Sequence, residues 1–243
     1  MKRYYCQNLE SNVLQENEAR HCVGVMRQKE GETITVFDGK GREWKSVIES
    51  IQKKCVRFKK LAESKTAPAP VPVILAQALT KPKSMDLIVQ KATELGAAEI
   101  IVLQSERSVS QFDDDRADAK AEKWKQTVIE ACKQCGQNWI PAVGAPLKIR
   151  DFIGESKRFG LKLIASLQDE AKPLREVLKE NRSHPALSQG VVIMIGPEGD
   201  FTPAEINEAR NNGFLPVSLG STVLRSETAA LFSLGAVIYE YHG

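Results

Sequence analysis

Long hydrophobic runs are absent from this sequence. A membrane-spanning helix needs about 20 mainly apolar residues in a row, and the apolar stretches here are far shorter. The N-terminal residues also lack the order of basic, apolar and small residues that defines a signal peptide. We therefore expect a cytoplasmic protein that makes no membrane contact.

Cysteine is sparse, and metal-ligand motifs are missing. The five cysteines are odd in number and scattered, which favours reduced thiols over a disulfide framework. Cys132 and Cys135 alone have the spacing of a metal or redox pair, but no second pair and no suitable histidine accompany them. The pattern favours two residues of one helix. No metal site is predicted, and a metal or redox function ranks last among the functions considered.

Internal repeats and low-complexity tracts are absent as well. A chain of 243 residues is long enough for one large domain or two small ones with real cores. The clearest boundary is segment 64–72, which is stiff and rich in proline and alanine. It predicts an N-terminal domain over residues 1–66 and a C-terminal domain over residues 73–243.

Net charge is small, at +3, but it is unevenly distributed. Residues 1–65 contain 14 Lys and Arg against 9 Asp and Glu, whereas the rest of the chain contains 20 against 22. A basic segment joined to a nearly neutral one suggests a domain that docks on a polyanion beside a domain that carries out chemistry. A chance excess on a solvated surface gives the same pattern, so charge alone does not decide.

The N-terminal part predicts a small β-barrel. Short strands are expected at 1–6, 33–37, 44–48 and 55–61, with a Gly-containing turn after residue 37 and a brief helix over 21–28. Basic side chains on these strands and turns suit phosphate contacts, and aromatic side chains can stack on bases. The aromatic residues fit a core better, however; they are Tyr4, Tyr5, Phe37 and Trp44.

From Val73 onward, strand and helix patterns alternate. Strands are expected at 73–79, 99–104, 161–167, 191–195 and 214–219, and helices at 84–95, 117–135, 173–180 and from Thr202. This alternation predicts an α/β fold with a mostly parallel sheet covered by helices on both faces. The helix over 117–135 is expected to bury one stripe, formed by Trp124, Val128, Ala131 and Cys135.

The last helix, over 227–241, is apolar on nearly every side. Burial all round a terminal helix needs more cover than one sheet face supplies. We therefore expect this helix to pack in a homodimer. The alternative is burial inside a single large core.

Segment 191–205 has the features of a ligand site. A buried strand at 191–195 is followed by the loop GPEGD and by a capping box from Thr202 to Glu205. Ligands collect at the carboxyl ends of such strands. The loop has no lysine and carries two carboxylates, which argues against a phosphate. Glycines beside apolar residues at 219–224 suit a nucleoside without phosphates instead.

Two loops together resemble a known signature. GPEG at 196–199 followed by LGSTVLRSETA at 219–229 resembles the C-terminal signature of the SPOUT (α/β trefoil-knot) methyltransferases. Within that superfamily the chain is similar to the bacterial small-subunit (16S) ribosomal RNA uridine-N3 methyltransferases. Further matching pieces span nearly the whole chain: residues 21–27, 37–39, 81–86, 90–96, 105–109 and 130–136.

The resemblance implies a PUA-like RNA-binding barrel, a knotted domain that binds S-adenosylmethionine, and a homodimer whose knots pack together. It implies small-subunit ribosomal RNA as the substrate, within an assembled 30S particle. The expected cofactor-binding residues are Leu167, Ile195, Gly196, Glu198, Gly199, Leu219, Gly220, Val223, Leu224, Thr228 and Ala229. The basic residues expected to bind RNA are Arg3, Arg27, Lys40, Arg42, Lys81 and Lys83.

Arg225 is the expected catalytic residue. Uridine N3 becomes nucleophilic when its proton leaves, and negative charge then spreads onto the flanking carbonyl oxygens, which a guanidinium can stabilise. The alternative for Arg225 is a salt bridge to Glu198 or Glu227. Glu198 is a candidate base, but its loop position also suits a hydrogen bond to the ligand or a cap on the helix at Thr202. No general base is assigned.

The chain departs from the family pattern at Gln137, where the family commonly has arginine, and at Gln111, where a basic residue is often seen. Lys133 and Trp139 are the candidates to supply the missing RNA contact. Two other functions stay open: ribose 2′-O methylation by the same superfamily, and a non-catalytic RNA-binding role in ribosome assembly.

Overall fold

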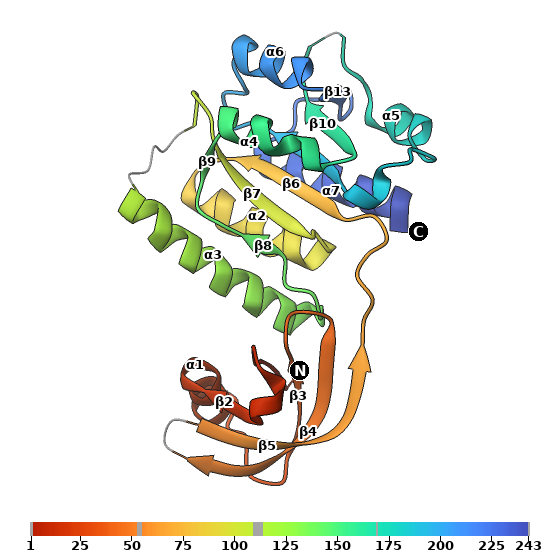
Figure 1. Ribbon diagram of the computed structural model, residues 1–243. Helices are drawn as coiled ribbons and strands as arrows, with labels where there is room; N and C mark the ends of the chain where they lie inside the picture. Colours follow the sequence, from red (N-terminus) through yellow and green to blue (C-terminus); the bar gives the residue numbers. More distant parts are fainter. Residues whose placement is uncertain (1, 53–54, 109–113, 169, 243) are drawn as a thin grey trace. The chain divides into compact units, whose positions relative to one another are not determined.

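The computed structural model describes residues 2–52, 55–108, 114–168 and 170–242. The chain divides into two compact units (Figure 1): unit 1 comprises Met1–Pro68 with Ile129–Ile140, and unit 2 comprises Ala69–Val128 with Pro141–Gly243. The proline-rich segment lies at the junction, where a boundary was predicted. Residues 129–140, predicted within the C-terminal domain, group with unit 1.

Unit 1 is built around a five-stranded sheet of order β1-β3-β4-β5-β2, in which β1 and β3 are parallel and the other pairs antiparallel. Its apolar core contains Tyr4, Ile34 and Trp44 among others. The elements are β1 (Arg3–Tyr5), η1 (Leu9–Ser11), β2 (Val13–Gln15), α1 (Glu16–Arg20), η2 (His21–Val25), β3 (Thr33–Phe37), β4 (Arg42–Gln52) and β5 (Cys55–Lys65).

The β3–β4 turn shows why this hairpin forms. Asp38 Oδ1 accepts hydrogen bonds from the backbone N–H groups of Lys40, at 2.7 Å, and Arg42, at 3.1 Å. Gly39 and Gly41 have φ angles of +73° and +91°, which glycine adopts without the steric cost that other residues carry. The sequence DGKG therefore specifies this turn, as predicted.

Unit 2 contains the alternating strands and helices. They are β6 (Val73–Ala78), α2 (Pro82–Leu95), β7 (Glu99–Gln104), α3 (Asp114–Cys135), β8 (Ala142–Val143), β9 (Leu147–Lys148), α4 (Ile149–Glu155), η3 (Ser156–Arg158), β10 (Leu161–Ala165), β11 (Lys172–Pro173), α5 (Leu174–Glu180), η4 (Leu187–Gln189), β12 (Val191–Ile195), α6 (Pro203–Asn211), β13 (Leu215–Ser218) and α7 (Ser226–His242). Helix α3 begins in unit 2 and ends in unit 1.

These strands form an eight-stranded sheet of order β11-β13-β10-β12-β6-β7-β8, with β9 also paired to β7, and every described pairing is parallel. Successive residues of a strand point to opposite faces. Ala76 and Met194 join one core with residues of α4 and α6. Helices α2 and α7 pack together, and α7 contacts β6 and β12, on the other face (Figure 1). The α/β class and the helix cover on both faces are confirmed.

Short elements account for most departures from the predicted strands and helices. Strands β2, β8, β9 and β11 have two or three residues each, too few to show a period in sequence. The helix predicted over 21–28 begins earlier, at Glu16, and ends as a π-helical turn.

Cys135, predicted in the buried stripe of α3, is exposed. The trefoil knot stays a prediction. Among the described residues, no helix is long and apolar enough to cross a membrane.

Candidate functional site

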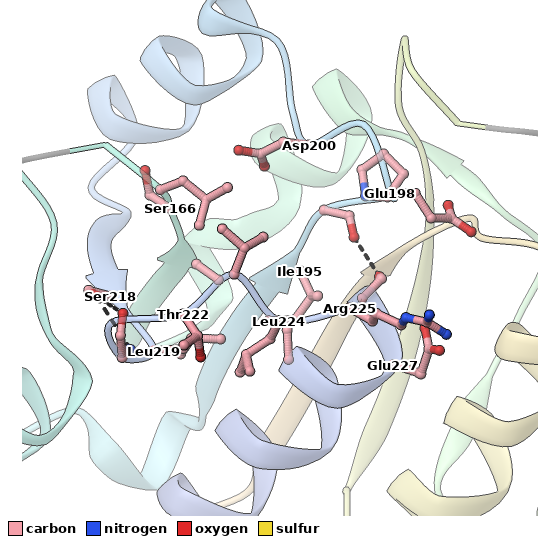
Figure 2. A pocket seen from close by; sticks show the side chains of 18 of the residues that line it. Ser166, Ile195, Glu198, Asp200, Ser218, Leu219, Thr222, Leu224, Arg225 and Glu227 are labelled. Carbon is pink, nitrogen blue, oxygen red and sulfur yellow. Dashed lines mark hydrogen bonds between the residues drawn. The ribbon is translucent and has the colours of Figure 1, made fainter.

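The carboxyl ends of three neighbouring strands surround a cavity of about 800 Å³. Its lining comes from the loops after β10, β12 and β13, together with the first residues of α2 and α7 (Figure 2). The sequence predicted ligand contacts from the loops after β12 and β13 and, through the family resemblance, from Leu167 in the loop after β10. The volume suits a nucleoside-sized ligand, since small-molecule sites commonly enclose about 300–1,000 Å³.

The structure brings together most of the residues predicted to bind the cofactor. Arg225 lines the same cavity, as does Lys81. The predicted cofactor residues that line it are Leu167, Ile195, Gly196, Glu198, Leu219, Gly220, Val223, Leu224 and Ala229. Gly199 and Thr228 do not line it: the Gly199 carbonyl accepts a hydrogen bond from Arg107 Nη1 at 2.9 Å, and Thr228 is exposed on α7.

A buried chain of hydrogen bonds fixes the floor of the cavity. Ser226 Oγ donates to the carbonyl of Gly196 at 2.6 Å and lies 3.0 Å from Gln77 Nε2, which donates to it. Gln77 is fully buried on β6, so α7 and the loop after β12 are both tied to the central strand. A Cβ at Gly196 would lie 2.9 Å from Asp200 Oδ1, so glycine permits this close loop. Neither residue was predicted to hold the site: Gln77 is a single polar residue within an apolar strand, and Ser226 stands inside the signature at 219–229 without any sign in the sequence of its distant partner.

The capping box predicted at the start of α6 is confirmed. Thr202 Oγ1 accepts from the backbone N–H of Glu205 at 3.3 Å, and Glu205 Oε2 accepts from the backbone N–H of Thr202 at 2.8 Å.

Glu198 does not cap the helix that begins at Thr202, so the prediction that it caps this helix is wrong. Its Oε1 instead accepts from the backbone N–H of Lys81, at 3.4 Å. Glu205 Oε1 also accepts from the backbone N–H of Glu106 at 2.9 Å, which joins the loop after β7 to the first turn of α6.

Charged groups of both signs line the cavity. Glu198, Arg225 and Glu227 lie together at one end in Figure 2, with Ser166 and Thr222 toward the other. Arg225 makes no ion pair with either carboxylate within the described part of the chain, so the alternative of a structural salt bridge is not observed. The Arg225 side chain is exposed and available to a ligand.

The prediction that Arg3 binds RNA is wrong. Arg3 is 4% exposed, and its guanidinium donates to the carbonyl of Gln137 at 2.9 Å. It also pairs with Glu43 and hydrogen-bonds Asn138 Oδ1. The side chain therefore holds residues 137–138 against the sheet of unit 1, and its burial keeps it from a phosphate.

Lys133 and Trp139 do not replace the arginine expected at position 137. Lys133 is 6% exposed, and its Nζ lies 3.0 Å from Glu18 Oε1 and 2.8 Å from Glu130 Oε1. Trp139 Nε1 donates to the carbonyl of Thr66 at 2.9 Å. The Lys133 ammonium and the indole N–H of Trp139 are therefore both used within unit 1. Position 111 lies outside the described residues.

The other predicted RNA contacts stand on the surface. Arg27 and Lys40 are exposed in unit 1, and Lys81 and Lys83 are exposed in unit 2. Arg42 is half-buried, and its guanidinium pairs with two carboxylates, those of Glu10 at 2.7 Å and Glu63 at 3.0 Å. Arg42 is therefore less available to a phosphate than the four exposed residues.

Cys132 and Cys135 differ too much to act as a pair. Burial raises the pKa of the Cys132 thiol to about 12, whereas Cys135 is exposed. The described residues contain no group of three or more side chains that could hold a metal. Because a thiolate is the reactive species, we expect iodoacetamide at about pH 8 to modify Cys135 and spare Cys132, as judged by peptide mass spectrometry. Both should react in denaturant; equal labelling of the native protein would contradict the assignment.

Comparisons with known proteins agree with this architecture. A family model described as RNA methyltransferase domain matches residues 67–238, and one described as RNA methyltransferase PUA domain matches residues 14–61. The chain is 31% identical to the ribosomal RNA small subunit methyltransferase E of Bacillus subtilis over 228 residues, which are 92% of this chain and 88% of that protein. It is 30% identical to the protein of the same name from Aquifex aeolicus, over 95% of this chain and 96% of that protein.

Solved structures match along nearly the full chain. Ribosomal RNA small subunit methyltransferase E from Neisseria gonorrhoeae, bound to S-adenosyl methionine, has a TM-score of 0.86 and 31% identity, covering 99% of this chain and 98% of its own. A methyltransferase from Legionella pneumophila, in complex with the bound cofactor SAM, has a TM-score of 0.88 and 33% identity, covering 98% and 97%. Since a family model covers most of the sequence and relatives align almost end to end, the chain belongs to the RNA methyltransferase family, with a PUA domain at its N-terminus.

Proposed function

We propose that this protein transfers the methyl group of S-adenosylmethionine to N3 of a uridine in small-subunit ribosomal RNA. The observation that carries the proposal is the cavity at the ends of β10, β12 and β13, with Arg225 at one end. It occurs in a chain that aligns almost end to end with two methyltransferases solved with this cofactor. The names of the relatives, which refer to the small ribosomal subunit, support the substrate class.

The lining of the cavity fits the cofactor. Leu167 is 64% exposed and Val223 is 76% exposed, although both border the cavity, so each offers an apolar surface that a purine ring would cover. Gly196 and Gly220 let backbone amides and carbonyls approach a ligand closely. When bound, S-adenosylmethionine supplies an already activated methyl group on a sulfonium. The protein has to hold that group in line with the acceptor nitrogen and to exclude water.

Arg225 stabilises the acceptor in this proposal. Loss of the N3 proton spreads negative charge onto the neighbouring carbonyl oxygens of uracil, and guanidinium donors in a partly dry site stabilise such charge strongly. The Arg225 side chain lines the cavity and makes no ion pair in the described structure. The backbone carbonyl of Arg225 accepts a hydrogen bond from the Ala229 N–H at 2.8 Å, which fixes the backbone of Arg225 at the start of α7.

Exposed basic residues in both units serve to bind RNA in this proposal. Arg27 and Lys40 lie on the unit that the PUA model matches, and Lys81 borders the cavity with Lys83 two residues away. Phosphate contacts position an RNA without specifying its sequence. The assembled 30S particle, which presents RNA in a fixed shape, is the proposed substrate.

A homodimer is proposed from the outer surface of α7. Phe232 is 50% exposed and Tyr239 is 82% exposed, and seven residues place them on one side of the helix. Leu87 and Leu95 of α2, the helix that packs on α7, are 41% and 40% exposed. Exposed apolar side chains gathered on neighbouring helices are characteristic of a subunit interface.

Phe232→Glu tests the dimer. A carboxylate buried against apolar side chains of a second copy would cost several kcal/mol unless paired, so we expect the variant to be monomeric. Sedimentation velocity measures the change, and Val25→Glu is the control, because Val25 is an exposed apolar residue of unit 1. A Phe232→Glu protein that sediments like the wild type would contradict the proposed interface.

The methylation itself is tested on ribosomal particles. The protein is incubated with S-adenosylmethionine and small subunits that lack the modification, and the RNA is digested to nucleosides for mass spectrometry. We expect 3-methyluridine, and none when the cofactor is left out. Methyl groups on ribose would support 2′-O methylation instead. RNA binding without any methylation would support a non-catalytic role in assembly.

A further inference from the structure

Asp200 is a carboxylate of the cavity to which the proposed function gives no role. It follows the GPEG sequence and lines the cavity with the residues before it. Its Oδ1 accepts a hydrogen bond from the backbone N–H of Phe201 at 2.7 Å. In Figure 2 the carboxylate points away from Glu198, toward the side of the cavity that carries Ser166.

Holding a side chain at this position is costly. The φ angle of Asp200 is +58°, in the left-handed region that glycine occupies without penalty and that aspartate tolerates less well. Burial also raises the pKa of the Asp200 carboxyl, because the charged form loses water. Backbone strain and desolvation at the edge of a ligand cavity together favour a role in binding.

No basic side chain of the cavity balances Asp200. The two basic residues that line the cavity are Lys81 and Arg225. In Figure 2 the Arg225 side chain lies beside Glu227, away from the Asp200 carboxylate. Among the described residues Asp200 makes no ion pair within 4 Å.

Arg107, which lies outside the cavity, acts on Asp200 through its charge without a direct ion pair among the described residues. Burial is the largest influence on the pKa of Asp200 and raises it; the positive charge of Arg107, whose Nη1 donates to the carbonyl of Gly199, lowers it by less. Arg107 is not among the residues that line the cavity. A carboxylate without an ion-pair partner in a partly dry cavity is suited to a cationic ligand group.

We infer that Asp200 binds a cationic group of the cofactor, and this inference rests on the proposed function. S-adenosylmethionine carries two such groups, the methyl sulfonium and the α-ammonium. The product S-adenosylhomocysteine keeps the ammonium but has a neutral sulfur. If the carboxylate contacts the sulfonium, Asp200 also makes the protein bind S-adenosylmethionine more tightly than S-adenosylhomocysteine. This difference in affinity promotes dissociation of the product.

Isothermal titration calorimetry on the full-length protein tests this inference. Asp200→Asn removes the charge, keeps the shape and still tolerates a positive φ. Asp200→Gly removes both the charge and the backbone strain. We expect each variant to bind S-adenosylmethionine about ten- to a hundredfold more weakly than the wild type, the range expected for the loss of one close contact between a carboxylate and a cationic group. The neutral fragment 5′-methylthioadenosine should bind all three proteins equally.

Three charged ligands identify the group that Asp200 holds. Weaker binding of S-adenosylmethionine and of sinefungin, which has an ammonium in place of the sulfonium, with unchanged binding of S-adenosylhomocysteine, assigns the carboxylate to the sulfonium. Equal losses for all three assign it to the α-ammonium.

Two results would overturn the inference: unchanged S-adenosylmethionine affinity in either variant, or an equal loss for 5′-methylthioadenosine, which would mean a deformed pocket. A wild-type protein that fails to bind S-adenosylmethionine would instead refute the proposed function.

Discussion

Replacing Arg225 with alanine is expected to lower kcat for RNA methylation about a hundred- to a thousandfold, with little change in the affinity for S-adenosylmethionine. That range is typical for the loss of one donor that stabilises charge developing in a transition state. The side chain of Arg225 is exposed and makes no ion pair in the described structure, so its removal leaves no carboxylate unpaired. The effect should therefore fall on the chemical step.

Single-turnover methylation of small subunits, with calorimetry for the cofactor, separates the two contributions. Arg150→Ala is the matched control: Arg150 lies on α4, its side chain is 86% exposed, and its 3.5 Å contact with Glu208 is a surface ion pair of little energetic value. Arg225→Lys should recover only part of the rate, since a lysine lacks the planar set of donors. A normal kcat in Arg225→Ala would remove Arg225 from the mechanism.

Gly160→Ala is expected to destabilise the protein by about 3 kcal/mol, which corresponds to a fall in Tm of about 6–12 °C for a domain of this size. Gly160 immediately precedes β10, and a Cβ there would lie 1.8 Å from the carbonyl oxygen of Ala186 and 2.5 Å from its carbonyl carbon. Both contacts are with backbone, which cannot rotate away as a side chain can. One of the two segments must shift, and β10 sits between β12 and β13 at the cavity.

Gly154→Ala is the matched control for this prediction. Gly154 lies within α4, and a Cβ there meets nothing within 4 Å. Alanine in an exposed helical position is favoured over glycine by up to about 1 kcal/mol, so Tm should stay the same or rise. Differential scanning calorimetry compares the two variants. A Gly160→Ala protein as stable as Gly154→Ala would show that the backbone at Ala186 yields readily.

The loop after β12 shows what local sequence can specify. Val191 to Ile195 form the predicted strand because five consecutive apolar residues are buried on both faces of a parallel sheet. Thr202 and Glu205 end the loop with the predicted capping box. These interactions involve residues within four positions of one another, so their spacing in the sequence is enough to predict them.

Basic residues show the opposite case. Arg3 and Lys133 carry the positive charge expected on an RNA-binding surface, yet both are buried in unit 1. Arg3 pairs with Glu43 and bonds residues 137–138, and Lys133 pairs with Glu18, more than a hundred positions away. Charge counted along a sequence does not distinguish a side chain that meets solvent from one that meets a distant carboxylate.

The sequence by itself determined the alternation of strands and helices, the turn and cap chemistry, and the motifs that mark the two loops, because each depends on neighbours along the chain. Only the tertiary structure decided that Gln77 and Ser226 tie the loop after β12 to α7 and the central strand, and how the loops after β10, β12 and β13 enclose one cavity. It also decided that neither Asp200 nor Arg225 has an ion-pair partner among the described residues. These outcomes depend on which strands become neighbours in the sheet, and that order is fixed by packing across the whole unit.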